Sequence, residues 1–433
     1  MPQVPGDTGP AGGTTFRAWA GPVVWVGLVA TAVVAGGAVR DNPRAHIGAA
    51  PFVGTWSAVI GWRLLPALIV AAAALAYGPR SADRLRWRAL LAASAAGALV
   101  WSVALAWADG ARSIAAPLAT RYEYLAAVPS VRSVGGFLRG FVDAVPTYPT
   151  HVKSHPPGMV LLLSALDRLG LGGAGPATVV VLVGGALAGV AALVALRELA
   201  GELAARRAAP FVAMGPAAVF LATSSDALFA GVSAWGIALV VLATGRVGRR
   251  SNALAGAGGL LLGATVFLSY GLALLLVVPA AVCAHRRRLD VAAVAVAVVA
   301  AVALAFAAGG FWWLDGLGAA RAAYARGAST LRPYGYFVVA NLAVFAVVVG
   351  PATASALGRL RDRRVWLLVG ATLLAVAAAD VSGLSKGEVE RIWLPFAPWV
   401  ALACCAVGTR TRPWLAANLA TAVGLQVLLR SPW

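Results

Sequence analysis

Polar chemistry is concentrated at residues 150–158 of an otherwise apolar chain. This stretch carries His151, Lys153 and His155, which are two of the four histidines and one of the two lysines in the protein. Such groups can donate hydrogen bonds to an anion, and imidazole can also bind a metal. On a helix the two histidines would share one face. Because Pro156 disfavours helical geometry at the preceding residue, we instead expect an extended or turning segment that presents donors from a rigid loop. A polar turn without a ligand is the alternative.

The second dense polar cluster is residues 386–391, which contains Lys386, Glu388, Glu390 and Arg391. An aromatic segment follows it, so the cluster can be read as an anchor at a membrane interface. Anchors do not need paired acids, however, whereas an anion-binding site benefits from cations held in place by carboxylates. We therefore predict that this cluster binds an anionic head group.

A loop near residue 330 adds cations and aromatic rings, including Arg332 and Tyr334. Aromatic faces with hydrogen-bonding rims suit sugars, and cations suit phosphates. We count both residues as candidates for substrate binding.

Glu123 is the candidate general base. It lies in a stretch, residues 111–128, that can form a helix on the membrane surface, and a carboxylate near an apolar surface can take a proton from a hydroxyl. The alternative is an exposed acid paired with Arg121 or Arg112.

Asp226 stands at the start of an apolar run, where it is expected to be the N-cap of the helix that follows. Capping does not exclude a second role, because a carboxylate at this depth also faces any cavity beneath the external loops. We include Asp226 among the substrate-binding candidates.

The composition identifies an integral membrane protein. The 433 residues are 61% hydrophobic and 12% charged, with a mean hydropathy of +0.83, which soluble domains do not show. The net charge of +19 comes from short clusters between apolar runs, as the positive-inside rule predicts, so we expect no nucleic-acid partner. The three cysteines have no metal-type spacing and are expected to be packing residues.

The predicted fold class is all-α, a polytopic membrane protein with about thirteen transmembrane helices. Residues 1–19 are expected to be a disordered cytoplasmic tail, and residues 20–433 a single transmembrane domain. The thirteen predicted spans are 20–38, 58–77, 89–107, 177–196, 208–223, 227–244, 253–269, 271–284, 289–309, 335–357, 365–380, 392–408 and 412–428.

A large external loop is expected at residues 108–176. Its apolar part, 156–170, is about 15 residues long and too short to cross a bilayer, so a re-entrant or interfacial helix is expected. With this assignment the arginine clusters at residues 80–88, 197–207, 246–250, 286–288, 359–364 and 410–412 fall on the cytoplasmic side, and the candidate site residues fall on the external face of the plasma membrane.

In their order along the chain, these features resemble the GT-C superfamily of membrane glycosyltransferases, which includes protein O-mannosyltransferases and the arabinofuranosyl- and mannosyltransferases of actinobacterial envelopes. The resemblance covers residues 107–399. Its marks are Arg121-Tyr122-Glu123-Tyr124, His155-Pro156-Pro157-Gly158, Ser225-Asp226-Ala227-Leu228-Phe229 and Gly387-Glu388-Val389-Glu390-Arg391.

The resemblance implies a sugar donor linked to polyprenyl phosphate and a glycan or lipid acceptor. It implies that Glu123 is the base for the acceptor hydroxyl and that Arg391 contacts the lipid phosphate, assisted by Lys386 and by Lys153 or His155. Many relatives carry paired acids where this chain has Tyr122 before Glu123. No metal ligands are therefore assigned, and a divalent metal stays an alternative.

Other classes also fit a chain with many spans. A transporter or flippase of lipid-linked sugar would carry ionisable residues or broken helices near the middle of the bilayer, whereas the polar groups here gather at one surface. A polymerase or ligase of surface polysaccharide would share the same donor, and a relative that only binds lipid-linked sugar would lack catalysis.

Overall fold

The computed structural model describes residues 11–41, 47–222, 224–408 and 410–431. Within these ranges, nine helical segments are long and apolar enough to cross a membrane, or ten if one bent pair counts as a span. The chain is therefore an all-α, multi-pass membrane protein.

The nine segments are Trp19–Arg40, Trp62–Arg84, Trp87–Trp107, Ala174–Ala200, Ser225–Thr244, Gly248–Leu268, Leu289–Ala308, Arg363–Val381 and Val389–Ala406. The elements that form them are α1 (Ala11–Arg40), η2 (Trp62–Leu64) with α2 (Leu65–Arg84), α3 (Trp87–Trp107), α7 (Ala174–Ala200), α10 (Ser225–Thr244), α11 (Gly248–Leu268), α13 (Leu289–Ala308), α17 (Arg363–Val381) and the string of α18 (Val389–Ile392), η9 (Leu394–Phe396), α19 (Ala397–Ala401) and η10 (Leu402–Ala406).

The predicted number of thirteen is not reached, because several apolar runs are broken or short. One predicted span becomes α15 (Tyr334–Val349) and α16 (Pro351–Leu357), which meet at an angle of 99°. Gly350 turns the chain there with a φ of 87°, a left-handed conformation that favours glycine. Asn418 then accepts a hydrogen bond from the backbone N–H of Ala352, at 3.0 Å, and stabilises the new helix start.

Three further predicted spans are not among these segments, because two are broken or short and the third is less apolar. The run at 208–223 divides into α8 (Glu202–Ala213) and α9 (Ala218–Leu221), separated by Gly215-Pro216. The run at 271–284 becomes η7 (Tyr270–Leu276) and α12 (Val277–His285), and the last one is α20 (Thr411–Leu428). Residues 1–10 of the predicted tail lie outside the described residues, and α1 already begins at Ala11.

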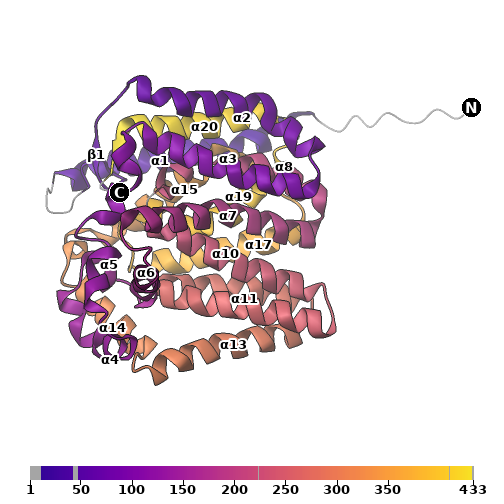
Figure 1. The fold of residues 1–433 in the computed structure, drawn as a ribbon. Helices are drawn as coiled ribbons and strands as arrows, with labels where there is room; N and C mark the ends of the chain where they lie inside the picture. Colours follow the sequence, from indigo (N-terminus) through magenta and orange to yellow (C-terminus); the bar gives the residue numbers. More distant parts are fainter. Residues whose placement is uncertain (1–10, 42–46, 223, 409, 432–433) are drawn as a thin grey trace, which may run out of the picture.

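The long helices run side by side, and short helices gather at one end of the bundle, on the left in Figure 1. We call this the site end. It carries α4 (Val134–Ala144), α5 (Thr150–Lys153), α6 (Gly158–Arg168) and α14 (Trp313–Tyr324). The 11 residues of α6 are too few to cross a bilayer. A single helix over 111–128 was expected, but the segment forms η3 (Ala111–Ile114), η4 (Ala116–Ala119) and η5 (Tyr124–Ser130), with a proline within both η4 and η5.

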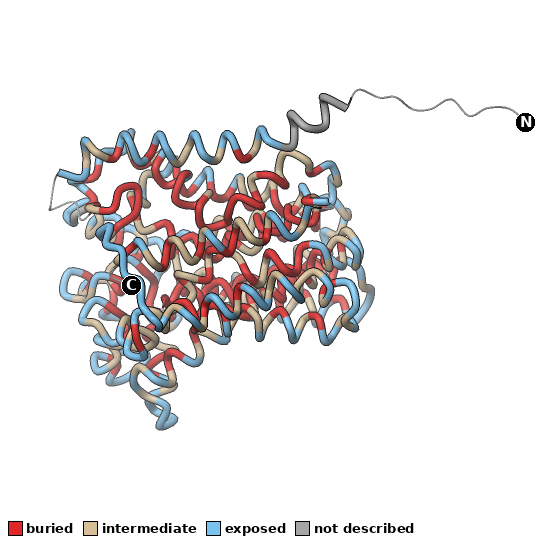
Figure 2. The backbone as a smooth tube through the Cα atoms, turned by 90° about the horizontal axis from the view of Figure 1, so that it is seen from above, coloured by how far each residue is buried: buried red, intermediate tan, exposed pale blue. Residues whose placement is uncertain are grey.

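The buried core runs through the middle of the bundle and is surrounded by exposed outer faces (Figure 2). Small residues bring α7 and α10 together there. A Cβ atom on Gly231 would lie 2.3 Å from the carbonyl oxygen of Gly184, so only glycine allows this approach. Close contact through small residues is a common way for membrane helices to pack. At the site end, β1 (Thr55–Trp56) pairs antiparallel with β2 (Leu429–Arg430).

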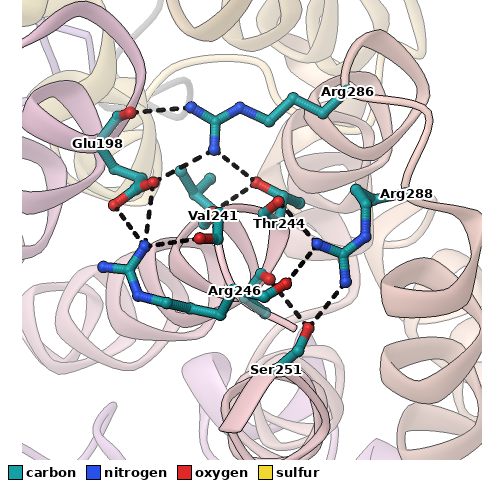
Figure 3. A network of polar contacts seen from close by, with 9 residues as sticks. Glu198, Val241, Thr244, Arg246, Ser251, Arg286 and Arg288 are labelled. Carbon is teal, nitrogen blue, oxygen red and sulfur yellow. Dashed lines mark hydrogen bonds and ion pairs between the residues drawn. The ribbon is translucent and has the colours of Figure 1, made fainter. Parts of the chain in front are cut away.

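The opposite end of the bundle carries a set of arginines that we call the arginine clamp, shown in Figure 3. Glu198 lies 3.2 Å from Arg246 and 3.3 Å from Arg286. Arg288 donates to the carbonyl oxygen of Thr244 at 2.8 Å and to that of Arg246 at 2.6 Å. The clamp therefore ties the C-terminal ends of α7, α10 and α12 to the start of α13. Its members are Glu198, Thr244, Arg246, Ser251, Arg286 and Arg288.

Candidate active site

Four separate segments converge at the site end. Glu123 is the N-cap of η5, His151 lies on α5, Asp226 is in the first turn of α10, and Arg391 is on α18. The first segment is held to the second by a backbone hydrogen bond from His151 to the carbonyl oxygen of Tyr122, at 3.1 Å. Residues from distant parts of the sequence thus form one buried polar cluster.

Arg391 is the centre of this cluster. Its Nη1 donates to Oδ2 of Asp226 at 2.9 Å, and its Nη2 lies 2.9 Å from both Nε2 of His151 and Oε2 of Glu388. The side chain is 5% exposed. A buried guanidinium needs such partners, because removing a charge from water is costly unless it is paired.

His151 joins Arg391 to Glu123. An arginine can only donate, so Nε2 of His151 must accept, and the imidazole proton lies on Nδ1. Nδ1 faces Oε1 of Glu123 at 2.7 Å, although the two are not aligned as a hydrogen bond. The other oxygen, Oε2, is buried and has no hydrogen-bond partner among the described residues. Glu123 therefore has one oxygen next to His151 and one buried oxygen without a hydrogen-bond partner.

His155 contacts the backbone of His151. The sequence predicted an extended or turning segment, but residues 150–153 form a single helical turn, after which Nδ1 of His155 lies 2.8 Å from the carbonyl oxygen of His151. The rings of Tyr124 and Phe229 pack against His155 at 5.7 and 6.0 Å. Burial lowers the pKa of His155 to about 4 and raises the pKa of Tyr124 well above its ordinary value. His155 is therefore neutral at physiological pH.

Asp226 is not the N-cap that the sequence predicted. The cap is Ser224, whose hydroxyl accepts a hydrogen bond from the backbone N–H of Asp226 at 3.3 Å. The same hydroxyl donates to Oδ2 of Asp226 at 2.9 Å. Because Ser224 caps the helix, the carboxylate of Asp226 is left to pair with Arg391.

Glu388 also contacts Arg332, whose Nη1 lies 3.6 Å from Oε1 of Glu388 and donates to the carbonyl oxygen of Lys386 at 2.6 Å. A Cβ atom on Gly387 would lie 3.2 Å from this Nη1, so a side chain there would crowd the guanidinium. Burial alone would raise the pKa of Glu388, but Arg391 and Arg332 outweigh burial and hold its pKa below the ordinary value. Glu388 is therefore ionised at neutral pH.

Glu390 is fully buried, and neither of its carboxylate oxygens has a hydrogen-bond partner within the described chain. A buried carboxylate without a partner is costly. The sequence assigned Glu390 to substrate binding, and the structure shows it beside the cluster but without a contact to it.

Three other candidates have different surroundings. Nζ of Lys386 lies 3.2 Å from the carbonyl oxygen of Ser329, and the hydroxyl of Tyr334 donates to the carbonyl oxygen of Val381 at 3.0 Å. Lys153 is half-buried at the end of α5, and no contact joins its side chain to the described cluster. These lysines and Tyr334 therefore do not line the Arg391 cluster.

A divalent metal does not fit the side chains as they stand. Nowhere in the described ranges are three or more His, Cys, Asp or Glu residues placed to hold one ion. The carboxylates of Asp226 and Glu388 surround the guanidinium of Arg391 instead.

Sequence reasoning missed three residues that shape the site. Tyr124 packs on both histidines, Ser224 caps α10, and Asn341 donates to Asp380 at 2.9 Å and accepts from the backbone N–H of Gly387 at 3.1 Å. Asn341 could have been found from the sequence, because it is an asparagine within an apolar run and a buried amide needs hydrogen-bond partners.

Two apolar hollows lie elsewhere in the bundle. A cavity of about 50 Å³ is bordered by Ala230, Val348 and Leu394, among other apolar residues, and a groove of about 540 Å³ lies between α2 and α20. Neither hollow is lined by a residue of the Arg391 cluster.

No protein-family model and no curated protein matches this chain. A similar solved structure is the crystal structure of the oligosaccharyltransferase of Archaeoglobus fulgidus in complex with Zn and sulfate, with 19% sequence identity and a TM-score of 0.39. The match covers 68% of this chain and 47% of that one, so this chain spans about half the length of the archaeal protein. A similarity of this degree carries no argument about function.

Proposed function

We propose that this protein is a membrane glycosyltransferase of the GT-C type, which transfers a sugar from polyprenyl phosphate to a hydroxyl group of a glycan or lipid acceptor. The observation that carries the proposal is the link from Glu123 through His151 to Arg391. One imidazole lies between an acid that has an oxygen without a hydrogen-bond partner and a buried guanidinium. A base and a cation for a leaving phosphate are the two groups that sugar transfer from a lipid phosphate requires.

In the proposed reaction, Oε2 of Glu123 takes the proton of the acceptor hydroxyl. The acceptor oxygen forms a bond to the anomeric carbon as the bond from that carbon to the phosphate oxygen breaks. The electron pair leaves with the phosphate, where Arg391 stabilises the developing negative charge. Asp226 orients hydroxyl groups of the sugar or of the acceptor.

The topology proposed with this function places the N-terminus in the cytoplasm, the arginine clamp on the cytoplasmic side and the Arg391 cluster on the external face of the plasma membrane. The distribution of arginines supports this orientation through the positive-inside rule.

The test is transfer of radiolabelled sugar from defined polyprenyl-phosphate sugars by the purified protein in detergent. Transport cannot be detected there, because no membrane separates two compartments. Glu123→Gln is expected to lower the rate by about 10²–10⁴-fold, as expected for loss of a general base. The matched control is Glu198→Gln in the arginine clamp, which should keep the rate within about threefold. Near-normal transfer by Glu123→Gln would show that Glu123 is not the base.

A further inference from the structure

Glu388 links two guanidinium groups. Its Oε2 lies 2.9 Å from Nη2 of Arg391 and its Oε1 lies 3.6 Å from Nη1 of Arg332. Two arginines that share one anion form the usual recognition pattern for carboxylates and phosphates, whose oxygens accept from the planar N–H groups. The carboxylate thus occupies a place that would suit a phosphate group.

Glu388 is also the accessible member of this cluster. Its side chain is 29% exposed, whereas those of Asp226 and Arg391 are 4% and 5% exposed. A ligand that arrives from the surface would meet Glu388 before it meets the buried Asp226–Arg391 pair.

The backbone of Glu388 is strained. Its φ is 64° and its ψ is 9°, in the left-handed region that residues with a side chain rarely adopt. Gly387, immediately before it, has a φ of 87°. Strained residues at a ligand site persist because surrounding contacts hold them, and they relax when those contacts are exchanged. The contacts to the two arginines are therefore part of what holds Glu388 in this conformation.

We propose that Arg332 and Arg391 together bind the phosphate group of the lipid-linked donor, and that Glu388 occupies the phosphate position until the donor displaces it. The proposal rests on the function proposed above and adds a residue that competes with the substrate. The bound carboxylate keeps both guanidinium groups paired when no donor is present. An anion must contact both arginines to replace it, so weakly bound anions are excluded.

The experiment measures binding of a short-chain polyprenyl monophosphate to the purified full-length protein, by calorimetry, without any transfer reaction. Glu388→Gln should bind the lipid phosphate about tenfold more tightly than the wild type, because a neutral amide competes poorly for the guanidinium groups. Arg332→Gln should bind it about tenfold more weakly. Inorganic phosphate is measured in parallel, and equal affinities for the two ligands would overturn the assignment to a lipid-linked phosphate.

The matched control is Glu390→Gln, which makes the same substitution two residues away, at a carboxyl without a hydrogen-bond partner. Its affinity should change by less than about twofold, since it contacts neither guanidinium. Equal gains in Glu390→Gln and Glu388→Gln, or no gain in Glu388→Gln, would overturn the proposal. If Glu388→Gln does not fold, Glu388→Asp is measured instead, because its shorter side chain cannot reach both arginines.

Failure of this proposal is distinguishable from failure of the proposed function. Phosphate binding that changes as expected in a protein without transfer activity would refute the glycosyltransferase assignment alone. A protein that loses transfer in Glu123→Gln but gains no affinity in Glu388→Gln would refute the competition by Glu388 alone.

Discussion

The two ends of α10 both carry polar clusters, and the two clusters have opposite compositions. At the site end one guanidinium, that of Arg391, is contacted by two carboxylates and a histidine. At the other end one carboxylate, that of Glu198, is contacted by two arginines, while Arg288 donates to backbone carbonyls (Figure 3).

The difference lies in how completely the polar groups are paired. The clamp arginines donate to carbonyl groups at helix C-termini, where a positive charge is stabilised by the helix dipole. The site end instead has a buried oxygen without a hydrogen-bond partner on Glu123, next to His151. Complete pairing is what a structural contact requires, whereas an unpaired buried oxygen beside a charged cluster indicates a site that is completed by a ligand.

The largest difference between the two ends should appear when arginine is replaced by lysine. Arg391→Lys keeps the charge but cannot contact Asp226, His151 and Glu388 together, so transfer should fall by about 10²–10³-fold. Arg246→Lys in the clamp should change the rate by less than about twofold. The measurement is kcat with a saturating lipid-linked donor. A rate for Arg391→Lys close to that of the wild type would mean that charge alone suffices at the site.

Acid should destabilise the site end through His155. Burial lowers the pKa of this histidine from 6.5 to about 4, so between these pH values the unfolded chain binds a proton that the folded chain does not. The free energy of unfolding should therefore fall by about 3 kcal/mol as the pH drops from 6.5 to 4. Thermal unfolding across this pH range is the measurement, with His155→Asn as the comparison. An equal decline in that variant would assign the acid sensitivity to other groups.

The smallest contrast concerns Glu390 and Glu198, for which the expected changes in the free energy of unfolding have opposite signs. Glu390→Gln removes an unpaired carboxyl and should raise the free energy of unfolding by about 1 kcal/mol. Glu198→Gln removes the charge that Arg246 and Arg286 contact and should lower it by about 1–3 kcal/mol. Denaturation in matched detergent measures both. Destabilisation by Glu390→Gln would reveal a partner for this acid in the folded protein.

The chemistry of the site was easier to anticipate than its architecture. Ionisable residues are rare in an apolar chain, so Glu123, His151, Asp226 and Arg391 stood out from composition alone. Their convergence depends on loops such as the helical turn of α5, which a flanking proline made appear unfavourable. Periodicity reports which face of a helix is apolar, but not which loop folds against which.

Two kinds of prediction needed the folded structure. The count of spans depended on local breaks such as that at Gly350. The helix after this break begins with a hydrogen bond from the backbone N–H of Ala352 to Asn418, which lies far along the chain. The direction of long side chains depended on partners that only the tertiary structure supplies. Lys386 stands in the richest polar cluster of the sequence, yet its amine contacts the carbonyl oxygen of Ser329.

The pairing of Asp226 with Arg391 has a consequence for biosynthesis. The two residues are separated by 165 positions, so at 5–20 residues per second the ribosome completes α10 roughly 10–30 s before the guanidinium exists. During this interval the aspartate has to remain hydrated or be shielded by the insertion machinery. Quality control should thus recognise chains truncated before α18 by an acid exposed to lipid. Pulse-chase turnover of such truncations, with and without Asp226→Asn, would detect this recognition as a difference in half-life.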